Sequence, residues 1–191
     1  MKHIKKVLLA LVILLASYFN ANSQYFDGVY IGGSLNSCIE KYKAKGYTLS
    51  KTTEISAIMK GKISNTAIEL YIFTTPKTKV VSNVAIYLPK YENWYALKTS
   101  YNDYVRILTD KYGKPDDVYT GFVSPYYEGD GYEMSAVELE KNNDLTLWFG
   151  KDNTNIGISI SKFKQVKIQY ENVINLAIKD KEQAEIDKNS F

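Results

Sequence analysis

The chain contains very little of the side-chain chemistry on which enzymes most often depend. Among its 191 residues there is one histidine and one cysteine, and its only arginine is Arg106. The single cysteine, Cys38, cannot form an intramolecular disulfide, so we expect packing alone to stabilise the fold. One arginine also leaves little means of binding phosphate groups through paired hydrogen bonds, which arginine makes better than lysine.

The histidine lies in a segment that has the pattern of a secretory signal peptide. Three lysines give this segment a basic start, residues 7–16 are an unbroken apolar run, and small residues stand before a cleavage point after Ser23. The apolar run is about half the ~20 residues that a helix needs to cross a bilayer. We therefore expect residues 1–23 to be removed, and the mature chain to be periplasmic or secreted, with no transmembrane segment.

Removal of this segment changes the chemistry that the chain has available. It takes away the only histidine, three of the 24 basic residues and none of the 21 acidic residues, so that equal numbers of each charge remain. Without histidine there is no Ser-His-Asp triad, no Cys-His pair and no histidine zinc site. Without net positive charge, a nucleic-acid partner has no electrostatic basis. We expect a protein that is not an enzyme and that uses no metal and no cofactor.

Capping residues and alternating patterns divide the chain into helices and strands in a repeated order. One helix with a single apolar side starts after Ser34 and stops at Gly46, and a longer helix starts after Asn93 and stops at Gly113. Alternation of apolar and polar residues predicts three strands after the first helix and four after the second. These strands cover residues 54–63, 67–75, 80–88, 135–140, 145–149, 155–161 and 165–170.

The order predicts an α+β fold of two tandem helix-plus-antiparallel-sheet units, each of αβββ type. The pseudo-repeats cover about residues 28–90 and 91–172, with the helices packed on one face of the sheet. Antiparallel pairing is expected because the turns between strands are too short for parallel crossovers. Residues 173–191 are a charged tail with few large apolar side chains, predicted to be a frayed helix or disordered.

The helix exit Tyr112-Gly113-Lys114-Pro115, directly before a run of strands, resembles the Gly-x-Pro exit of small exported bacterial modules. These include the outer-membrane-assembly lipoprotein family SmpA/OmlA and the β-lactamase-inhibitory protein (BLIP) family; the pattern is also similar to exported proteins of Gram-negative bacteria. The resemblance implies a BLIP-like architecture over about residues 28–172, in which two tandem units form a sheet whose face binds a partner protein. The chain has neither the acylated cysteine of the lipoproteins nor the disulfides of the inhibitor.

Paired carboxylates are the catalytic chemistry that remains available. Glu138 and Glu140 share one face of a predicted strand at roughly 7 Å, a separation that overlaps that of an inverting glycosidase pair. Their alternative role is simply to be the solvated face of that strand. Cys38 lies on the apolar side of the first helix, which favours a buried structural thiol over a nucleophile. The acidic turn at Glu128 and Asp130 binds a cation only if a third oxygen ligand approaches.

Aromatic residues give the candidate binding surfaces, because the chain has 17 tyrosines. The glycine-rich loop of residues 121–132 is predicted either to form a contact surface or to fold back over the sheet. The candidate residues in that loop are Tyr126, Tyr127 and Tyr132. In the sheet the candidates are Tyr71, Phe73 and Trp148, which are binding residues if one sheet face is uncovered and core residues if both faces are covered.

The leading hypothesis is an exported, non-catalytic binding or accessory module. It recognises a protein or glycan partner through a sheet face and the 121–132 loop. A carboxylate-based glycan hydrolase and a purely structural envelope protein are the alternatives that the sequence leaves open.

Overall fold

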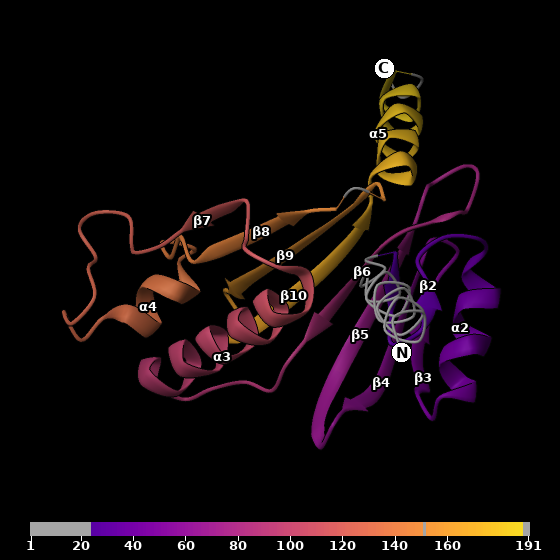
Figure 1. The fold of residues 1–191 in the computed structure, drawn as a ribbon. Helices are drawn as coiled ribbons and strands as arrows, with labels where there is room; N and C mark the ends of the chain where they lie inside the picture. Colours follow the sequence, from indigo (N-terminus) through magenta and orange to yellow (C-terminus); the bar gives the residue numbers. More distant parts are fainter. Residues whose placement is uncertain (1–23, 151, 189–191) are drawn as a thin grey trace, which may run out of the picture.

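A computed structural model of the chain describes residues 24–150 and 152–188, so that the predicted signal peptide and the end of the tail lie outside the described residues. Its main feature is an antiparallel sheet of eight strands (Figure 1). In their order across the sheet, these are β3 (Thr48–Thr52), β4 (Ser56–Ile63), β5 (Thr66–Thr74), β6 (Val81–Tyr87), β10 (Gln165–Asn172), β9 (Thr154–Ser161), β8 (Leu145–Phe149) and β7 (Asp117–Tyr119). The predicted α+β class, with a large antiparallel sheet, is confirmed.

The first part of the chain supplies one helix and four consecutive strands. Helix α2 (Leu35–Ala44) begins after Ser34, whose hydroxyl accepts a hydrogen bond from the Ser37 amide at 3.3 Å. The helix buries one apolar side, which includes Cys38. Strands β4, β5 and β6 follow the three predicted strands closely. Strand β3 was not predicted, because its residues are exposed throughout, Leu49 is its only apolar side chain, and it shows no alternation.

The second part repeats the order of a helix followed by strands. Helix α3 (Trp94–Tyr112) begins where predicted, after Asn93, whose side chain accepts a hydrogen bond from the Ala96 amide at 2.9 Å, and it ends at Gly113, with φ of 89°. Strands β8, β9 and β10 lie where they were predicted. The short edge strand β7 was not predicted.

One predicted strand, residues 135–140, is wrong. This segment contains helix α4 (Glu133–Glu138), which closes with a hydrogen bond from the Lys141 amide to the Ala136 carbonyl at 2.8 Å. The adjacent residues Ala136 and Val137 are both buried, which a strand with one solvated face does not allow. The alternation that suggested a strand extends over too few residues to separate the two periods.

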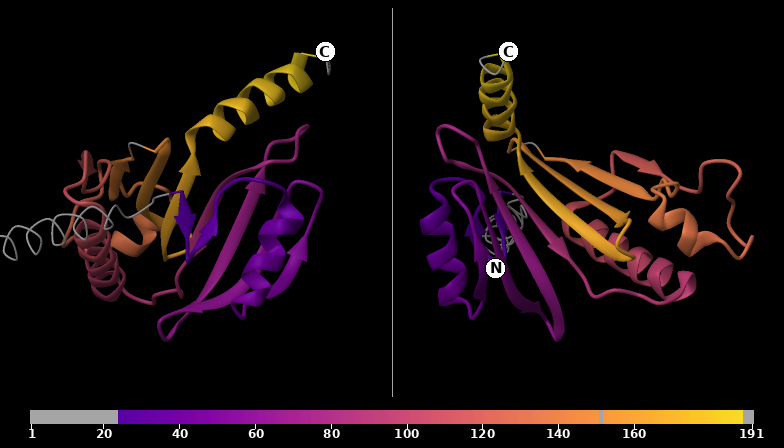
Figure 2. Two further views of the ribbon diagram at one scale, coloured as in Figure 1. Left: turned by 45° about the vertical axis from the view of Figure 1, so that its right-hand side comes forward. Right: turned by 180° about the vertical axis from the view of Figure 1, so that it is seen from behind.

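Helices α2 and α3 pack on the same face of the sheet (Figure 2). The core lies between these two helices and the sheet. Helix α2 contacts β3, β4 and β5, and α3 contacts β9 and β10. A two-stranded ribbon of β1 (Tyr25–Phe26) and β2 (Val29–Tyr30) adds to this core. The Phe26 ring lies 5.5 Å from that of Tyr170 on β10 and 6.3 Å from that of Tyr42 on α2. Aromatic packing therefore joins the ribbon to both parts of the chain.

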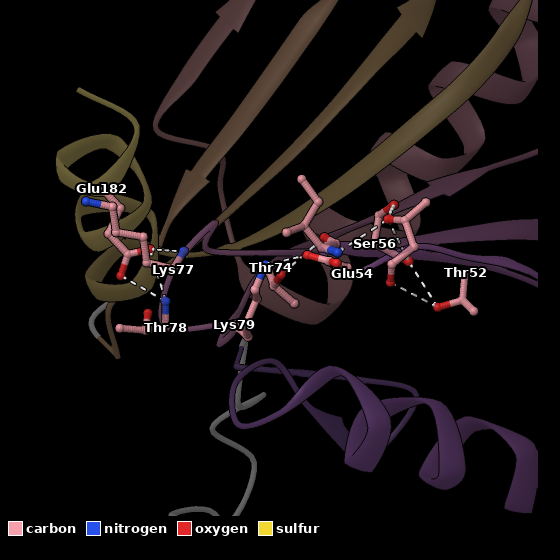
Figure 3. A network of polar contacts seen from close by, with 10 residues as sticks. Thr52, Glu54, Ser56, Thr74, Lys77, Thr78, Lys79 and Glu182 are labelled. Atoms are coloured by element: carbon pink, nitrogen blue, oxygen red, sulfur yellow. Dashed lines mark hydrogen bonds and ion pairs between the residues drawn. The ribbon is translucent and has the colours of Figure 1, made fainter. Parts of the chain in front are cut away.

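The tail predicted to be either a frayed helix or disordered is a helix over its described part. Helix α5 (Val173–Lys188) continues directly from β10 and extends away from the end of the sheet (Figure 2). The Glu182 carboxylate accepts hydrogen bonds from the amides of Lys77 and Thr78, at 2.6 and 3.2 Å, in the turn between β5 and β6 (Figure 3). Glu182 is the one buried residue among those described in α5, so a polar contact rather than an apolar face positions this helix.

Candidate binding face of the sheet

The side of the sheet opposite α2 and α3, here called the open face, is the first candidate surface. The strand register places one residue from each of six neighbouring strands in a row across it. From β4 to β8, this row is Ile58, Tyr71, Ala85, Gln169, Gly157 and Leu147. The row combines aromatic, aliphatic, amide and very small side chains, so that its surface is neither a packed core nor uniformly polar.

Aromatic side chains gather on the β5 and β6 part of the open face. The Tyr71 ring lies 6.3 Å from that of Phe73, and 5.0 Å from that of Tyr87 in an edge-to-face arrangement. All three are half-buried. Burial raises the pKa of Tyr71, and the nearby carboxylate of Glu69 raises it further. The two predicted residues Tyr71 and Phe73 thus lie together on the face that α2 and α3 do not cover.

The middle of the open face carries polar groups on β10 that the sequence analysis did not single out. Lys167, Gln169 and Glu171 alternate with buried apolar residues and face the open side. The Gln169 amide donates a hydrogen bond to the Glu171 carboxylate. Burial lowers the pKa of Lys167, and the charge of Glu171 opposes that change. The alternation of residues 165–171 was the available signal, but it does not reveal that β10 lies at the centre of the sheet.

Two hollows lie on either side of Lys167. One, of about 260 Å³, is lined by Leu145, Leu147, Phe149, Asn155, Ile156, Gly157, Ser159, Lys167, Gln169 and Glu171. The other, of about 340 Å³, is lined by Tyr87, Val137, Glu140, Asn142, Ser159, Ile160, Ser161, Lys162, Phe163 and Lys167. Lys167 and Ser159 line both hollows, so that a ligand in either one meets the same ammonium group.

Trp148 is not on the open face. It is only 3% exposed, and it lies on the side of β8 that faces the helices. Its indole N–H donates a hydrogen bond to the Gly113 carbonyl at 2.9 Å, just after α3. Trp148 is therefore a core residue. Its neighbours Leu147 and Phe149 reach the open face, as does Leu145.

The tyrosine-rich loop is a second exposed surface, separate from the open face. Tyr127 and Tyr132 are 66% and 65% exposed, and Tyr126 is half-buried. The Asp130 carboxylate accepts hydrogen bonds from the amides of Tyr127 and Tyr132, at 3.0 and 2.7 Å, which fixes the turn. The Trp94 indole at the start of α3 donates to Glu128 at 3.4 Å. The loop is thus attached to the N-terminal end of α3, and Figure 1 shows it extending beyond α4.

The two carboxylates of the hydrolase alternative are not paired on a strand. Glu138 ends α4 and Glu140 lies in the turn after it, and both are exposed. Each is instead paired with a lysine: Glu138 with Lys164 at 2.5 Å, and Glu140 with Lys162 at 3.4 Å. Glu140 lines the 340 Å³ hollow, and Glu138 is not among the residues that line it. The geometry that suggested an inverting glycosidase pair is therefore missing from this segment.

The remaining candidates lie in structural settings. Cys38 is buried on the inner side of α2, and burial raises the pKa of its thiol to about 11. In the acidic turn, Glu128 and Asp130 accept hydrogen bonds from the protein itself. Within residues 24–150 and 152–188, no three or more Cys, His, Asp or Glu side chains are placed to hold a metal ion.

Comparison of the chain with protein-family models, with curated proteins and with solved structures gave no match. Of the helices that the structure describes, none is both long and apolar enough to cross a membrane. The surfaces of the chain are therefore the basis for its proposed function.

Proposed function

We propose that the chain is an exported, non-catalytic binding or accessory module that recognises a protein or glycan partner through the open face of its sheet. The pattern of residues 1–23 supports export to the periplasm or beyond the cell. The observation that carries the proposal is a broad sheet with two helices on one side and half-exposed aromatic rings on the other. A surface of this kind is typical of contact sites.

The arrangement of the strands supports a further part of the proposal, that two related units form the face. Each part of the chain contributes a helix and then four strands that are neighbours in the sheet, and the last strands of the two parts, β6 and β10, pair at the centre. We infer a BLIP-like plan in which the two units join their sheets to give a partner one continuous surface. The 121–132 loop supplies a second contact area at one end of the molecule.

The test compares substitutions on the open face with matched substitutions in the loop. Tyr71→Thr with Phe73→Thr removes two aromatic rings and keeps residues that favour strands. Tyr127→Ser with Tyr132→Ser removes two exposed rings of the loop. Each protein is used to capture partners from an envelope extract and to co-sediment with insoluble cell-wall glycan, after circular dichroism has shown that it is folded.

We expect the wild-type chain and the loop variant to retain the same partner, and the open-face variant to lose it. Loss of the partner in the loop variant alone would move the contact surface to residues 121–132. Retention of the partner by all three proteins would contradict the proposal. Sedimentation with glycan and capture of protein distinguish the two classes of partner.

A further inference from the structure

We propose that the 260 Å³ hollow over β8, β9 and β10 binds an acidic peptide segment of a partner, with a carboxylate on Lys167 and a neighbouring aliphatic side chain against Leu145 and Leu147. This inference rests on the proposed function, because it names the chemistry of the partner for the same open face. It is carried by an ammonium group that forms no ion pair with the residues that the structure describes, beside an apolar wall.

Each of the four other partly buried lysines that the structure describes lies near a carboxylate or an aromatic ring. Three have a carboxylate at 2.5–3.5 Å, and the fourth lies over an aromatic ring at 5.9 Å. These pairs are Lys79 with Glu54, Lys98 with Asp144, Lys164 with Glu138, and Lys179 with Phe73. Lys167 is also partly buried, yet among the residues that the structure describes it has neither an ion pair nor a ring contact of this kind. Among the described residues, Lys167 is therefore the partly buried lysine without an ion pair or ring contact, and the nearby charge of Glu171 only partly offsets its burial.

The surroundings of Lys167 explain why no carboxylate among the described residues forms an ion pair with it. Its neighbours across the sheet are Tyr87 on β6 and Ser159 on β9, which carry hydroxyl groups and no charge at neutral pH. Along β10 the nearest acid on the same face is Glu171, which already accepts a hydrogen bond from the intervening Gln169. Leaving a cation in this position is unfavourable for folding. The same desolvation strengthens its attraction to an incoming carboxylate, because less water has to be displaced.

The rest of the hollow indicates what accompanies the carboxylate. Leu145 and Leu147 form one wall, and Phe149, which is 51% exposed, extends it. Gly157 keeps the floor open, since a Cβ atom there would lie 3.2 Å from a methyl group of Leu147. Aliphatic walls suit aliphatic side chains, whereas sugars are bound chiefly by aromatic faces and polar groups. The wall of Leu145 and Leu147 therefore favours an acidic peptide, while Phe149 and the polar residues of the same hollow make an acidic glycan the alternative that the experiment must test.

The experiment uses two capped pentapeptides that differ only in charge, Ac-Ala-Leu-Glu-Leu-Ala-NH₂ and its glutamine counterpart. Each is titrated into isotope-labelled protein while the backbone amide signals are followed by NMR. The proteins are the wild type, Lys167→Met, which keeps the length of the side chain, and Lys167→Arg, which keeps its charge. Galacturonic acid is titrated in parallel as a carboxylate carried on a sugar.

We expect the glutamate peptide to shift amide signals of β8, β9 and β10 and to bind the wild type about tenfold more tightly than the glutamine peptide, which corresponds to ~1.4 kcal/mol. Lys167→Met should remove that difference, and Lys167→Arg should restore it. Equal binding of the two peptides, no binding, or shifts centred on residues 121–132 would each overturn the proposal. Binding of galacturonic acid through Lys167 without binding of the glutamate peptide would assign the hollow to glycans and contradict the proposal of a peptide ligand.

Capture of the envelope partner by two variants distinguishes a wrong ligand for the hollow from a wrong binding surface. If Lys167→Met keeps the envelope partner while Tyr71→Thr with Phe73→Thr loses it, the open face is the binding surface and the Lys167 hollow is not part of it. If neither change affects the partner, the open face itself is the wrong surface. If Lys167→Met does not fold, the comparison of the two peptides on the wild-type chain still decides the question.

Discussion

Two neighbouring rows of residues cross the same six strands of this sheet and point in opposite directions. On the covered side, from β4 to β8, the row is Met59, Leu70, Ile86, Ile168, Ile158 and Thr146, all of them buried. On the open side it is Ile58, Tyr71, Ala85, Gln169, Gly157 and Leu147, of which Ala85 alone is buried and the others are partly exposed. The strands, their twist and their hydrogen bonds are shared. The difference in composition therefore reflects what each side contacts, which is a close-packed core on one side and solvent or a partner on the other.

The strongest way to test this comparison is to truncate two adjacent aromatic residues of β8 that point to opposite sides. Trp148→Ala removes a buried ring and its hydrogen bond to Gly113, and we expect it to lower the free energy of unfolding by about 3–5 kcal/mol. Phe149→Ala, on the exposed side, should lower it by less than about 1 kcal/mol. Urea unfolding followed by circular dichroism measures both. Equal losses would mean that the two sides do not differ as described.

The next largest contrast is between two lysines. Lys98 forms an ion pair at 2.5 Å with Asp144, whose side chain is fully buried, so Lys98→Met leaves a buried carboxylate without its cation. We expect that substitution to cost about 3 kcal/mol. Lys167→Met, on the open face, should change stability by less than about 1 kcal/mol or increase it, because burial disfavours its charge. Both variants are compared by urea unfolding at neutral pH. A large loss for Lys167→Met would show that this lysine serves the fold.

A smaller and local effect is expected for α5. Burial disfavours the charge of Glu182, but the hydrogen bonds from Lys77 and Thr78 outweigh burial and lower its pKa below the usual 4.5. The carboxylate therefore stabilises the docking of α5 fully above pH 4.5, and this contribution is lost as the pH falls through the lowered pKa. Glu182→Gln should speed hydrogen exchange of the α5 amides at neutral pH and leave the sheet amides unchanged. Unchanged α5 exchange would mean that other contacts position this helix.

The smallest effect on stability is expected on the open face itself. Tyr71→Thr removes the ring contacts with Phe73 and Tyr87 but keeps a residue that favours strands. We expect it to lower the free energy of unfolding by about 1 kcal/mol or less, the range of cross-strand side-chain pairs. Thermal unfolding of wild type and variant measures the difference. A loss close to that of Trp148→Ala would make Tyr71 part of the core and weaken its assignment to a binding surface.

Local sequence signals were sufficient wherever they extended over several turns or alternations. The bounds of α3 follow from the cap at Asn93, the apolar spacing and the stop at Gly113. Strand β9 could be read from its strict alternation. Signals failed for segments that are short or exposed throughout. Strand β3 exists because its backbone pairs with β4, and α4 exists because Ala136 and Val137 find a buried position together.

The candidate site was predicted only in part. Alternation put Tyr71 and Phe73 on one side of β5, and that side is the open one. The same reasoning could not place Trp148, because β8 has large apolar residues on both sides and only its pairing with β9 decides which of them is covered. Nothing in the sequence indicates that Lys167 forms no ion pair with the described residues, since that depends on which residues its neighbouring strands bring opposite it.

The sequence by itself determined the types of the longer elements, the antiparallel pairing of most consecutive strands and the scarcity of histidine and thiol chemistry, because caps, turns, periodicity and composition act over a few residues. Only the tertiary structure decided which side of the sheet is covered, that β6 and β10 adjoin, and that a lysine at the centre of the open side forms no ion pair with the described residues. Those outcomes depend on contacts between residues far apart in the chain, which compete for the same buried surface.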